Sequence, residues 1–209
     1  MLYYANPCSD EVRQAMRNGL LGFIDTPAQG NRREPNVDWI ADNGCYSNRW
    51  NADHWWKWLT RQPRTMRFCT APDVVGDWRA TLELFTTWSP AMSTLSLPTA
   101  CVAQDGATNE TMPWHAISAV FIGGSTEWKL SKHAEAIVAE ANKRSTWAHI
   151  GRVNSLRRLQ WAKQIGANSV DGTMLTFNPT ARLRQLLRWM QQIETQPSLD
   201  GLTQRKEVV

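Results

Sequence analysis

Short apolar runs alternate with longer amphipathic stretches along this chain. The runs predict eight strands, at roughly 2–5, 22–25, 37–41, 67–70, 98–103, 119–122, 147–151 and 169–171. The amphipathic stretches predict helices at 9–19, 53–61, 77–88, 127–143, 155–166 and 180–193. Strands that alternate with helices predict a parallel α/β sheet, and eight of them predict a small (β/α)8 TIM-like barrel. We expect one catalytic domain over 1–194 and a polar tail over 195–209.

Local signals at the ends of these stretches support the assignment. Asp77 and Ser155 stand just before two predicted helices, where a short oxygen-bearing side chain caps free N–H groups. Gly166 stands just after one of them, as a C-terminal glycine does. The segment 26–36 has no helical pattern, and its length predicts a loop above the barrel mouth.

Five of the apolar runs end in polar or glycine clusters, each followed by a stretch that can be helical. They are 39–44, 68–73, 101–106, 120–124 and 169–172. The carboxyl ends of barrel strands meet at one face, which is where barrel enzymes place their catalytic groups. We therefore expect three carboxylates and one carboxamide to meet there: Asp42, Asp73, Asp171 and Gln104.

Each of these groups suits a particular chemistry. Two carboxylates that converge on one bond can act as nucleophile and proton carrier in glycosidic cleavage. A glutamine at a strand end can form paired hydrogen bonds with a nucleobase edge, and Gly123 and Gly124 would let a ligand approach the backbone. Asp42 precedes Asn43-Gly44, which is also a common turn sequence, so taken alone it could be a turn residue.

Composition narrows the picture further. The formal net charge of +4 is weakly in favour of a polyanionic partner. The twelve tryptophans either fill contacts between helices and barrel or provide a stacking surface for bases. The four cysteines and four histidines show no metal-ligand spacing, so we expect no metal and no cofactor. Neither a signal peptide nor a run long enough to span a membrane is present, so we expect a soluble cytoplasmic protein.

The order of the strand ends resembles the tRNA-guanine transglycosylase superfamily, which includes the phage and bacterial 7-deazaguanine DNA transglycosylases. The family's Asp-Ser-Gly-Gly-Phe-Gln motif is similar to 42–47, its Gly-Ile-Val-Gln-Gly segment to 101–106, and its Ile-Gly-Gly turn to 122–124. Its Met-Gly-Val-Gly strand end is similar to 149–153, and its nucleophile segment to 166–172. The resemblance covers roughly residues 37–175.

This resemblance implies a role for each matched residue. Asp171 would be the nucleophile on C1′ of the target nucleotide, and Asp42 the general acid/base. Asp73, Gln104, Gly123 and Gly124 would hold the purine-like base. The implied activity is exchange of a guanine-type base in nucleic acid for a 7-deazaguanine through a covalent intermediate.

The chain also departs from the family pattern. It lacks the zinc-binding cysteines and histidine of the tRNA enzymes, which makes a tRNA partner less expected than DNA. Tyr46-Ser47 replaces the Phe-Gln ending, and 125–128 replaces a loop of small residues, which leaves the base preference open. A compact chain without the zinc subdomain is most similar to the phage DNA-modifying branch, which would act in the host cytoplasm.

Four other activities are open at this stage. They are hydrolytic DNA base excision on the same scaffold, tRNA modification, nucleic-acid binding without catalysis, and hydrolysis of a sugar by an unrelated barrel. For nucleic-acid binding across the mouth, the candidates are Arg32, Arg33, Arg49, Trp50 and Arg152. The same residues could instead form an ordinary solvated basic surface.

Overall fold

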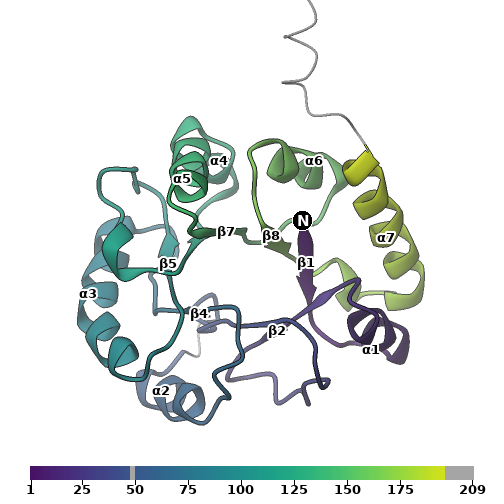
Figure 1. Ribbon diagram of the computed structural model, residues 1–209, viewed down its shortest axis with the longest axis horizontal. Helices are drawn as coiled ribbons and strands as arrows, with labels where there is room; N and C mark the ends of the chain where they lie inside the picture. The colour runs from purple at the N-terminus through teal and green to yellow at the C-terminus, as the bar shows by residue number, and fades with distance from the viewer. Residues whose placement is uncertain (48–49, 196–209) are drawn as a thin grey trace, which may run out of the picture.

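The computed structural model describes residues 1–47 and 50–195. Its centre is a closed barrel of parallel strands in the order β1 to β8, surrounded by helices (Figure 1). This confirms the predicted α/β barrel. The strands are β1 (Leu2–Ala5), β2 (Gly22–Asp25), β3 (Trp39–Ala41), β4 (Cys69–Thr70), β5 (Thr99–Ala103), β6 (Ala119–Ile122), β7 (Trp147–Ile150) and β8 (Ser169–Asp171).

In the part of the chain that the structure describes, the outer layer consists of α-helices and two short 3-10 helices. The α-helices are α1 (Asp10–Arg17), α2 (Ala52–Thr60), α3 (Trp78–Thr94), α4 (Thr126–Lys129), α5 (Lys132–Lys143), α6 (Leu156–Gln164) and α7 (Pro179–Thr195). The 3-10 helices are η1 (Trp114–Ala116) and η2 (Met174–Thr176). None of the helices in the described part of the chain is long and apolar enough to cross a membrane.

The predicted caps are present at two helix starts. The side chain of Asp77 accepts a hydrogen bond from the Ala80 amide at 3.0 Å, and that of Ser155 accepts one from the Arg158 amide at 3.4 Å. One predicted helix, 127–143, is wrong as a single element. Ser131 has extended backbone angles, and its Oγ accepts from the Ala134 amide. It is therefore the N-cap of α5, and the helix is interrupted between α4 and α5.

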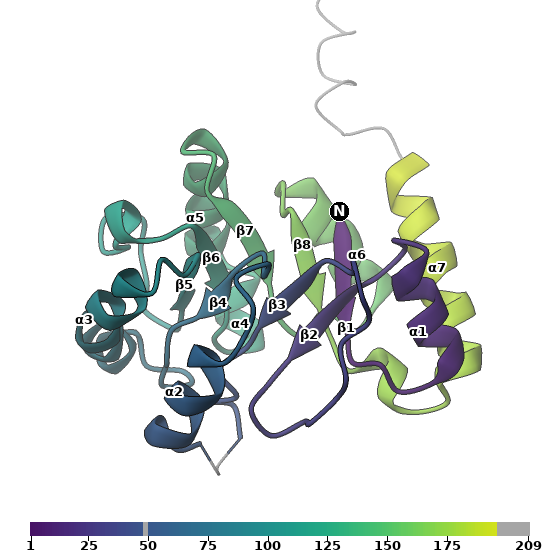
Figure 2. The same cartoon turned by 60° about the horizontal axis from the view of Figure 1, so that its bottom comes forward.

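Two connections between strands contain no α-helix. The stretch after 101–106 was expected to be able to form one, but only η1 lies between β5 and β6. The loop 26–36 joins β2 to β3, and Figure 2 shows it extending beyond the tip of β2 before it returns toward the start of β3. Only part of this loop therefore lies above the barrel mouth.

The returning half of the loop packs on the outside of the barrel. Glu34 accepts hydrogen bonds at 2.9 Å from both Arg13 and Arg17 of α1. The guanidinium of Arg33 lies over the ring of Trp39, 3.6 Å from its centroid. These contacts hold the loop against α1 and β3 in a connection that contains no α-helix.

Strand alternation separates the core into two layers. Outward-facing residues pack under the helices, while Tyr4, Ile24, Ile40, Phe68, Ala100, Val102, Ala119 and Phe121 form a separate buried cluster inside the barrel. Gly22 makes room for the ring of Tyr4, because a Cβ there would lie 2.3 Å from it. The same inward alternation, continued past the strand ends, brings Asp42, Gln104 and Asp171 to the top of the barrel.

Candidate active site

A cavity of about 320 Å³ opens at the carboxyl ends of the strands. Residues from or just after every one of the eight strands line it, as expected for the functional face of a barrel. Its polar lining includes Asn6, Thr26, Gln29, Asp42, Asn43, Thr70, Asp73, Gln104, Arg152, Asp171 and Thr173, and its glycines are Gly44, Gly123, Gly124, Gly151 and Gly172. The structure thus brings together all six residues expected to act on the base or the bond.

Asp42 lies at the end of β3, where burial strongly disfavours its charged form. Its Oδ1 accepts a hydrogen bond from the Gly44 amide at 2.6 Å. Burial, together with the nearby charges of Asp171 and Asp73, raises the pKa of Asp42 to about 7 despite that hydrogen bond. A carboxyl group that titrates near neutrality can both donate and accept a proton during a reaction.

Asp171 ends β8 on the same cavity, with 17% of its side chain exposed. Its Oδ1 lies 3.1 Å from Nε2 of His149 and accepts from the backbone amide of Arg152 at 3.2 Å. Arg152 has a φ of 62°, an unfavourable conformation for a residue with a side chain, and this turn directs its amide to Asp171. No described residue donates to Oδ2, which leaves that oxygen available to a ligand.

Asp73 belongs to a hydrogen-bonded group of side chains from three neighbouring strand ends. Its Oδ1 accepts from Asn43 Nδ2 at 2.8 Å, and its Oδ2 accepts from Gln104 Nε2 at 2.6 Å. Burial raises the pKa of Asp73, and the hydrogen bonds from Asn43 and Gln104 oppose that rise. The carboxylate is therefore fixed in orientation while one edge still borders the cavity.

Gln104 is 2% exposed, and both the nitrogen and the oxygen of its side-chain amide form hydrogen bonds within the protein. Besides holding Asp73, its Oε1 accepts from the amides of Gly76 at 2.9 Å and Gly124 at 2.7 Å. A Cβ on Gly123 would lie 2.8 Å from Gln104 Nε2, so that glycine is needed to make room for the amide. The geometry gives Gln104 an orienting role more readily than the direct base contact expected from the sequence.

Most backbone polar groups of Gly123 and Gly124, which follow β6, also have hydrogen-bond partners within the protein. The Gly123 amide donates to Ala103, and the Gly124 carbonyl accepts from the Arg152 guanidinium. The Gly124 amide donates to Gln104 Oε1. Of the two carbonyls, only that of Gly123 accepts no hydrogen bond from a described residue. Gly123 lines the cavity, which makes this carbonyl a candidate acceptor for a base.

The candidates for nucleic-acid contact are not all at the cavity. Arg152 lines it and lies over the ring of Tyr46, 4.8 Å from the centroid. Arg33 is instead held on the outer side of β3, where it also donates to Gln62. Arg32 is exposed in the returning half of the loop. Trp50 packs 6.5 Å from Trp55 in the outer layer. Arg49 lies outside the described residues.

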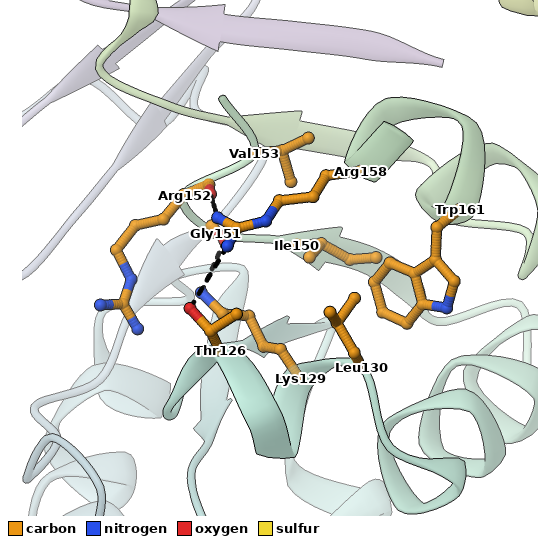
Figure 3. Close-up of a pocket in the computed structure, with 9 residues that line it drawn as sticks. All are labelled: Thr126, Lys129, Leu130, Ile150, Gly151, Arg152, Val153, Arg158 and Trp161. Carbon is orange, nitrogen blue, oxygen red and sulfur yellow. Dashed lines mark hydrogen bonds between the residues drawn. The ribbon is translucent and has the colours of Figure 1, made fainter. Parts of the chain in front are cut away.

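A small second cavity lies behind the tip of β7, between α4 and α6 (Figure 3). Lys129 and Arg158 approach the backbone of Gly151 and Arg152 from this side, whereas the Arg152 side chain points away. Lys129 Nζ donates to the Gly151 carbonyl at 2.8 Å, and Arg158 donates to the Arg152 carbonyl at 3.3 Å. Burial, with the charge of Arg152 adding to it, lowers the pKa of Lys129 to about 8.

Two contributors to the site were not predicted from sequence. Asn43 was interpreted only as part of a turn, yet it is 3% exposed and binds Ala71, Asp73 and Thr70. His149 was placed in a matched strand end but given no role at the site, yet it contacts Asp171. A signal was present for His149, because it is a polar residue in a short apolar strand. Among residues 1–47 and 50–195, no cluster of metal-ligating side chains is found.

Comparisons with known proteins define the fold only. No protein-family model and no curated protein matches the chain. Among solved structures, it is similar to the Amycolatopsis orientalis BexX/CysO complex, with a TM-score of 0.57 and 16% identity over 93% of this chain and 91% of that chain. It is also similar to a mandelate racemase/muconate lactonizing enzyme-like protein from Rubrobacter xylanophilus, with a TM-score of 0.48 and 13% identity over 83% of this chain and 57% of that chain.

Proposed function

We propose that this chain is an enzyme that exchanges a guanine-type base in DNA for a 7-deazaguanine through a covalent intermediate on Asp171. One observation carries the proposal: Asp42 and Asp171 line one cavity but have different surroundings. Asp171 is held by hydrogen bonds at one oxygen, with the other oxygen open to the cavity. Asp42 titrates near neutrality.

These two groups can perform the first half of the exchange. Oδ2 of Asp171 attacks C1′, the bond from C1′ to the base nitrogen breaks, and its electron pair stays with the departing base. Asp42, in its protonated form, supplies the proton that the departing base needs. The result is an ester between Asp171 and the sugar, with Asp42 left as a carboxylate.

The second half reverses these roles. The incoming 7-deazaguanine gives its ring proton to Asp42 and attacks C1′, which breaks the ester and restores the Asp171 carboxylate. If water took the place of the incoming base, the product would be an abasic site. The same residues therefore support hydrolytic excision, and the two outcomes differ only in the second nucleophile.

The neighbouring side chains suit a guanine-type ring. A guanine edge presents two adjacent N–H donors, and a fixed carboxylate such as Asp73 can accept from both. Gly123 lines the same cavity, and its carbonyl is a further candidate acceptor. Acceptors held in place by Asn43 and Gln104 favour a base with donors at that edge and disfavour adenine.

Mass spectrometry of nucleosides tests the proposal directly. The protein is incubated with single-stranded DNA, duplex DNA or tRNA, with and without a 7-deazaguanine base, and the products are digested to nucleosides. We expect 7-deazaguanine nucleoside in a DNA sample, dependent on the added base. Abasic sites formed without added base would show an excision enzyme instead, incorporation into tRNA alone would replace the DNA assignment, and unchanged nucleic acid in every sample would contradict the proposal.

A further inference from the structure

His149 is enclosed inside the barrel, beneath the candidate nucleophile. It is 0% exposed, and the rings of Tyr4, Phe68 and Phe121 surround it at centroid distances of 5.8, 5.5 and 4.5 Å. A ring in such apolar surroundings must satisfy both nitrogens from within the protein. Its two polar neighbours are Ser169 Oγ, 2.8 Å from Nδ1, and Asp171 Oδ1, 3.1 Å from Nε2.

The direction of these hydrogen bonds follows from Trp147, the first residue of β7. Trp147 is a donor only, and its Nε1 donates to Ser169 Oγ at 2.7 Å. Ser169 thus accepts from Trp147, and its own single hydrogen is free to point to Nδ1 of His149. On the other side of the ring the Asp171 carboxylate can only accept, so Nε2 of a neutral ring carries the proton and Nδ1 accepts from Ser169.

We propose that Trp147, Ser169 and His149 form a directed hydrogen-bond relay that fixes His149 as the neutral Nε2–H tautomer and positions Asp171 to react through Oδ2. The relay spans only two neighbouring strands. Trp147 and His149 face inward on β7, Ser169 and Asp171 on β8, and His149 pairs with Ser169 in the sheet register. The tautomer assignment stands on these contacts alone, whereas the consequence for attack rests on the proposed function.

A neutral donor at this position has a specific chemical advantage. An imidazolium would pair with the Asp171 carboxylate and withdraw charge from the attacking oxygen. A neutral N–H group, with the Arg152 amide beside it, orients Oδ1 and leaves the carboxylate its full charge. His149 is a positioning residue in this account, since it contacts Asp171 and is separated from the cavity by it.

Nitrogen-15 NMR of histidine-labelled protein reads the tautomer directly. His149 is one of four histidines, and its signals are assigned by their loss in His149→Gln. We expect one protonated nitrogen, Nε2, and one unprotonated nitrogen, Nδ1. A proton on Nδ1, or on both nitrogens, would overturn the relay whether or not the protein is a transglycosylase.

Kinetics test the positioning role with substitutions that each remove one hydrogen-bonding group of the relay. Ser169→Ala and Trp147→Phe each interrupt the relay, and His133→Gln, on an exposed histidine, is the matched control. We expect Ser169→Ala and Trp147→Phe to slow formation of the covalent DNA complex by about 10- to 100-fold at saturating DNA, with the half-saturating concentration unchanged. His149→Gln, whose amide can still donate to Asp171, should retain more activity than His149→Ala.

The NMR and kinetic experiments together separate failure of the relay from failure of the proposed function. Ser169→Ala with the wild-type tautomer and the wild-type rate would contradict the relay. A rate loss that appears only as weaker DNA binding would contradict the positioning role. If wild-type protein forms no covalent complex, the proposed function fails, and the NMR result alone still decides the tautomer and the direction of the hydrogen bonds.

Discussion

Asp42 and Asp171 show how surroundings differentiate two identical side chains. Asp171 has hydrogen-bond donors on one oxygen, which stabilise and orient a carboxylate. Asp42 has a single backbone donor and is buried beside two other carboxylates, which favours its protonated form. This is the division of labour that a nucleophile and a proton carrier require.

The raised pKa of Asp42 predicts a measurable effect on stability. Its pKa is about 7 in the folded protein and about 3.9 in an unfolded chain. Folding therefore favours the protonated form, and the stability associated with it is lost as pH rises from about 4 to about 7. Asp42→Asn should be more stable than wild type at pH 8 by roughly 2–4 kcal/mol, with a difference that shrinks toward pH 5. Urea unfolding at several pH values measures this, and a pH-independent difference would contradict it.

The same group predicts the pH dependence of the first chemical step. Departure of the base needs protonated Asp42, so the rate of covalent complex formation should fall as pH rises above about 7. Asp42→Asn should be slow at every pH and lack this decline. Single-turnover rates between pH 5.5 and 9 provide the measurement. A decline that persists unchanged in the variant would assign it to another group.

At the scale of elements, side chains from two neighbouring helices support the tip of β7. Lys129 in α4 and Arg158 at the start of α6 bind its carbonyls, and the Arg152 side chain links it to the tip of β6. Lys129 is 5% exposed and has no carboxylate within ion-pair distance among the described residues. A buried cation held mainly by a carbonyl keeps a free-energy penalty when charged.

That penalty predicts how Lys129 affects stability. Its pKa is about 8 in the folded protein, below the ordinary 10.5. The unfolded chain therefore binds more protons between about pH 8 and 10.5, and stability should rise with pH in that window. Relative to Lys129→Met, wild type should gain up to roughly 3 kcal/mol between pH 7.5 and pH 10.5. The exposed Lys132→Met is the control and should show no such gain; a flat difference for Lys129→Met would contradict the burial argument.

The elements were predictable from sequence to the extent that their signals are local. Alternation of apolar runs located all eight strands, and Asp77 and Ser155 marked helix starts. The break at Ser131 was missed because the apolar spacing continues across it. The contacts of His149 were missed for a different reason: Ser169 and Asp171 lie on the next strand, and only the register of β7 against β8 brings them to the ring. Likewise, that Gln104 holds Asp73 depends on the packing of neighbouring strand ends.

At the scale of the whole molecule, the reactive groups lie at the carboxyl ends of the strands. Arg33 and Trp50 instead pack in the outer layer, Arg33 on the ring of Trp39. If DNA crosses this face, a target base must leave its stack to reach Asp171, and phosphate contacts near the mouth would offset that cost. Arg152 is the described arginine that lines the cavity. Two of the candidate arginines therefore differ in their surroundings: Arg152 lines the cavity, whereas Arg33 packs on Trp39 outside the barrel.

This division predicts different effects of two arginine substitutions on DNA binding. Wild-type affinity for a single-stranded oligonucleotide should fall steeply with salt, and Arg152→Gln should reduce the slope of log K against log salt by about one unit. Arg33→Gln should leave the slope unchanged and lower the unfolding temperature, since it removes the contact with Trp39. Binding measured between 50 and 300 mM salt tests both. Affinity that does not vary with salt would point to a small-molecule substrate instead.

Intact-protein mass spectrometry of a denatured reaction mixture tests the covalent intermediate most directly. Wild type is mixed with single-stranded DNA without added base and denatured, and bound DNA is then located by peptide mapping. We predict a DNA adduct on the peptide that contains Asp171, its loss in Asp171→Asn with folding and DNA affinity retained, and its persistence in the exposed control Asp53→Asn. An adduct of equal yield in Asp171→Asn, or an adduct mapped to another residue, would contradict the account.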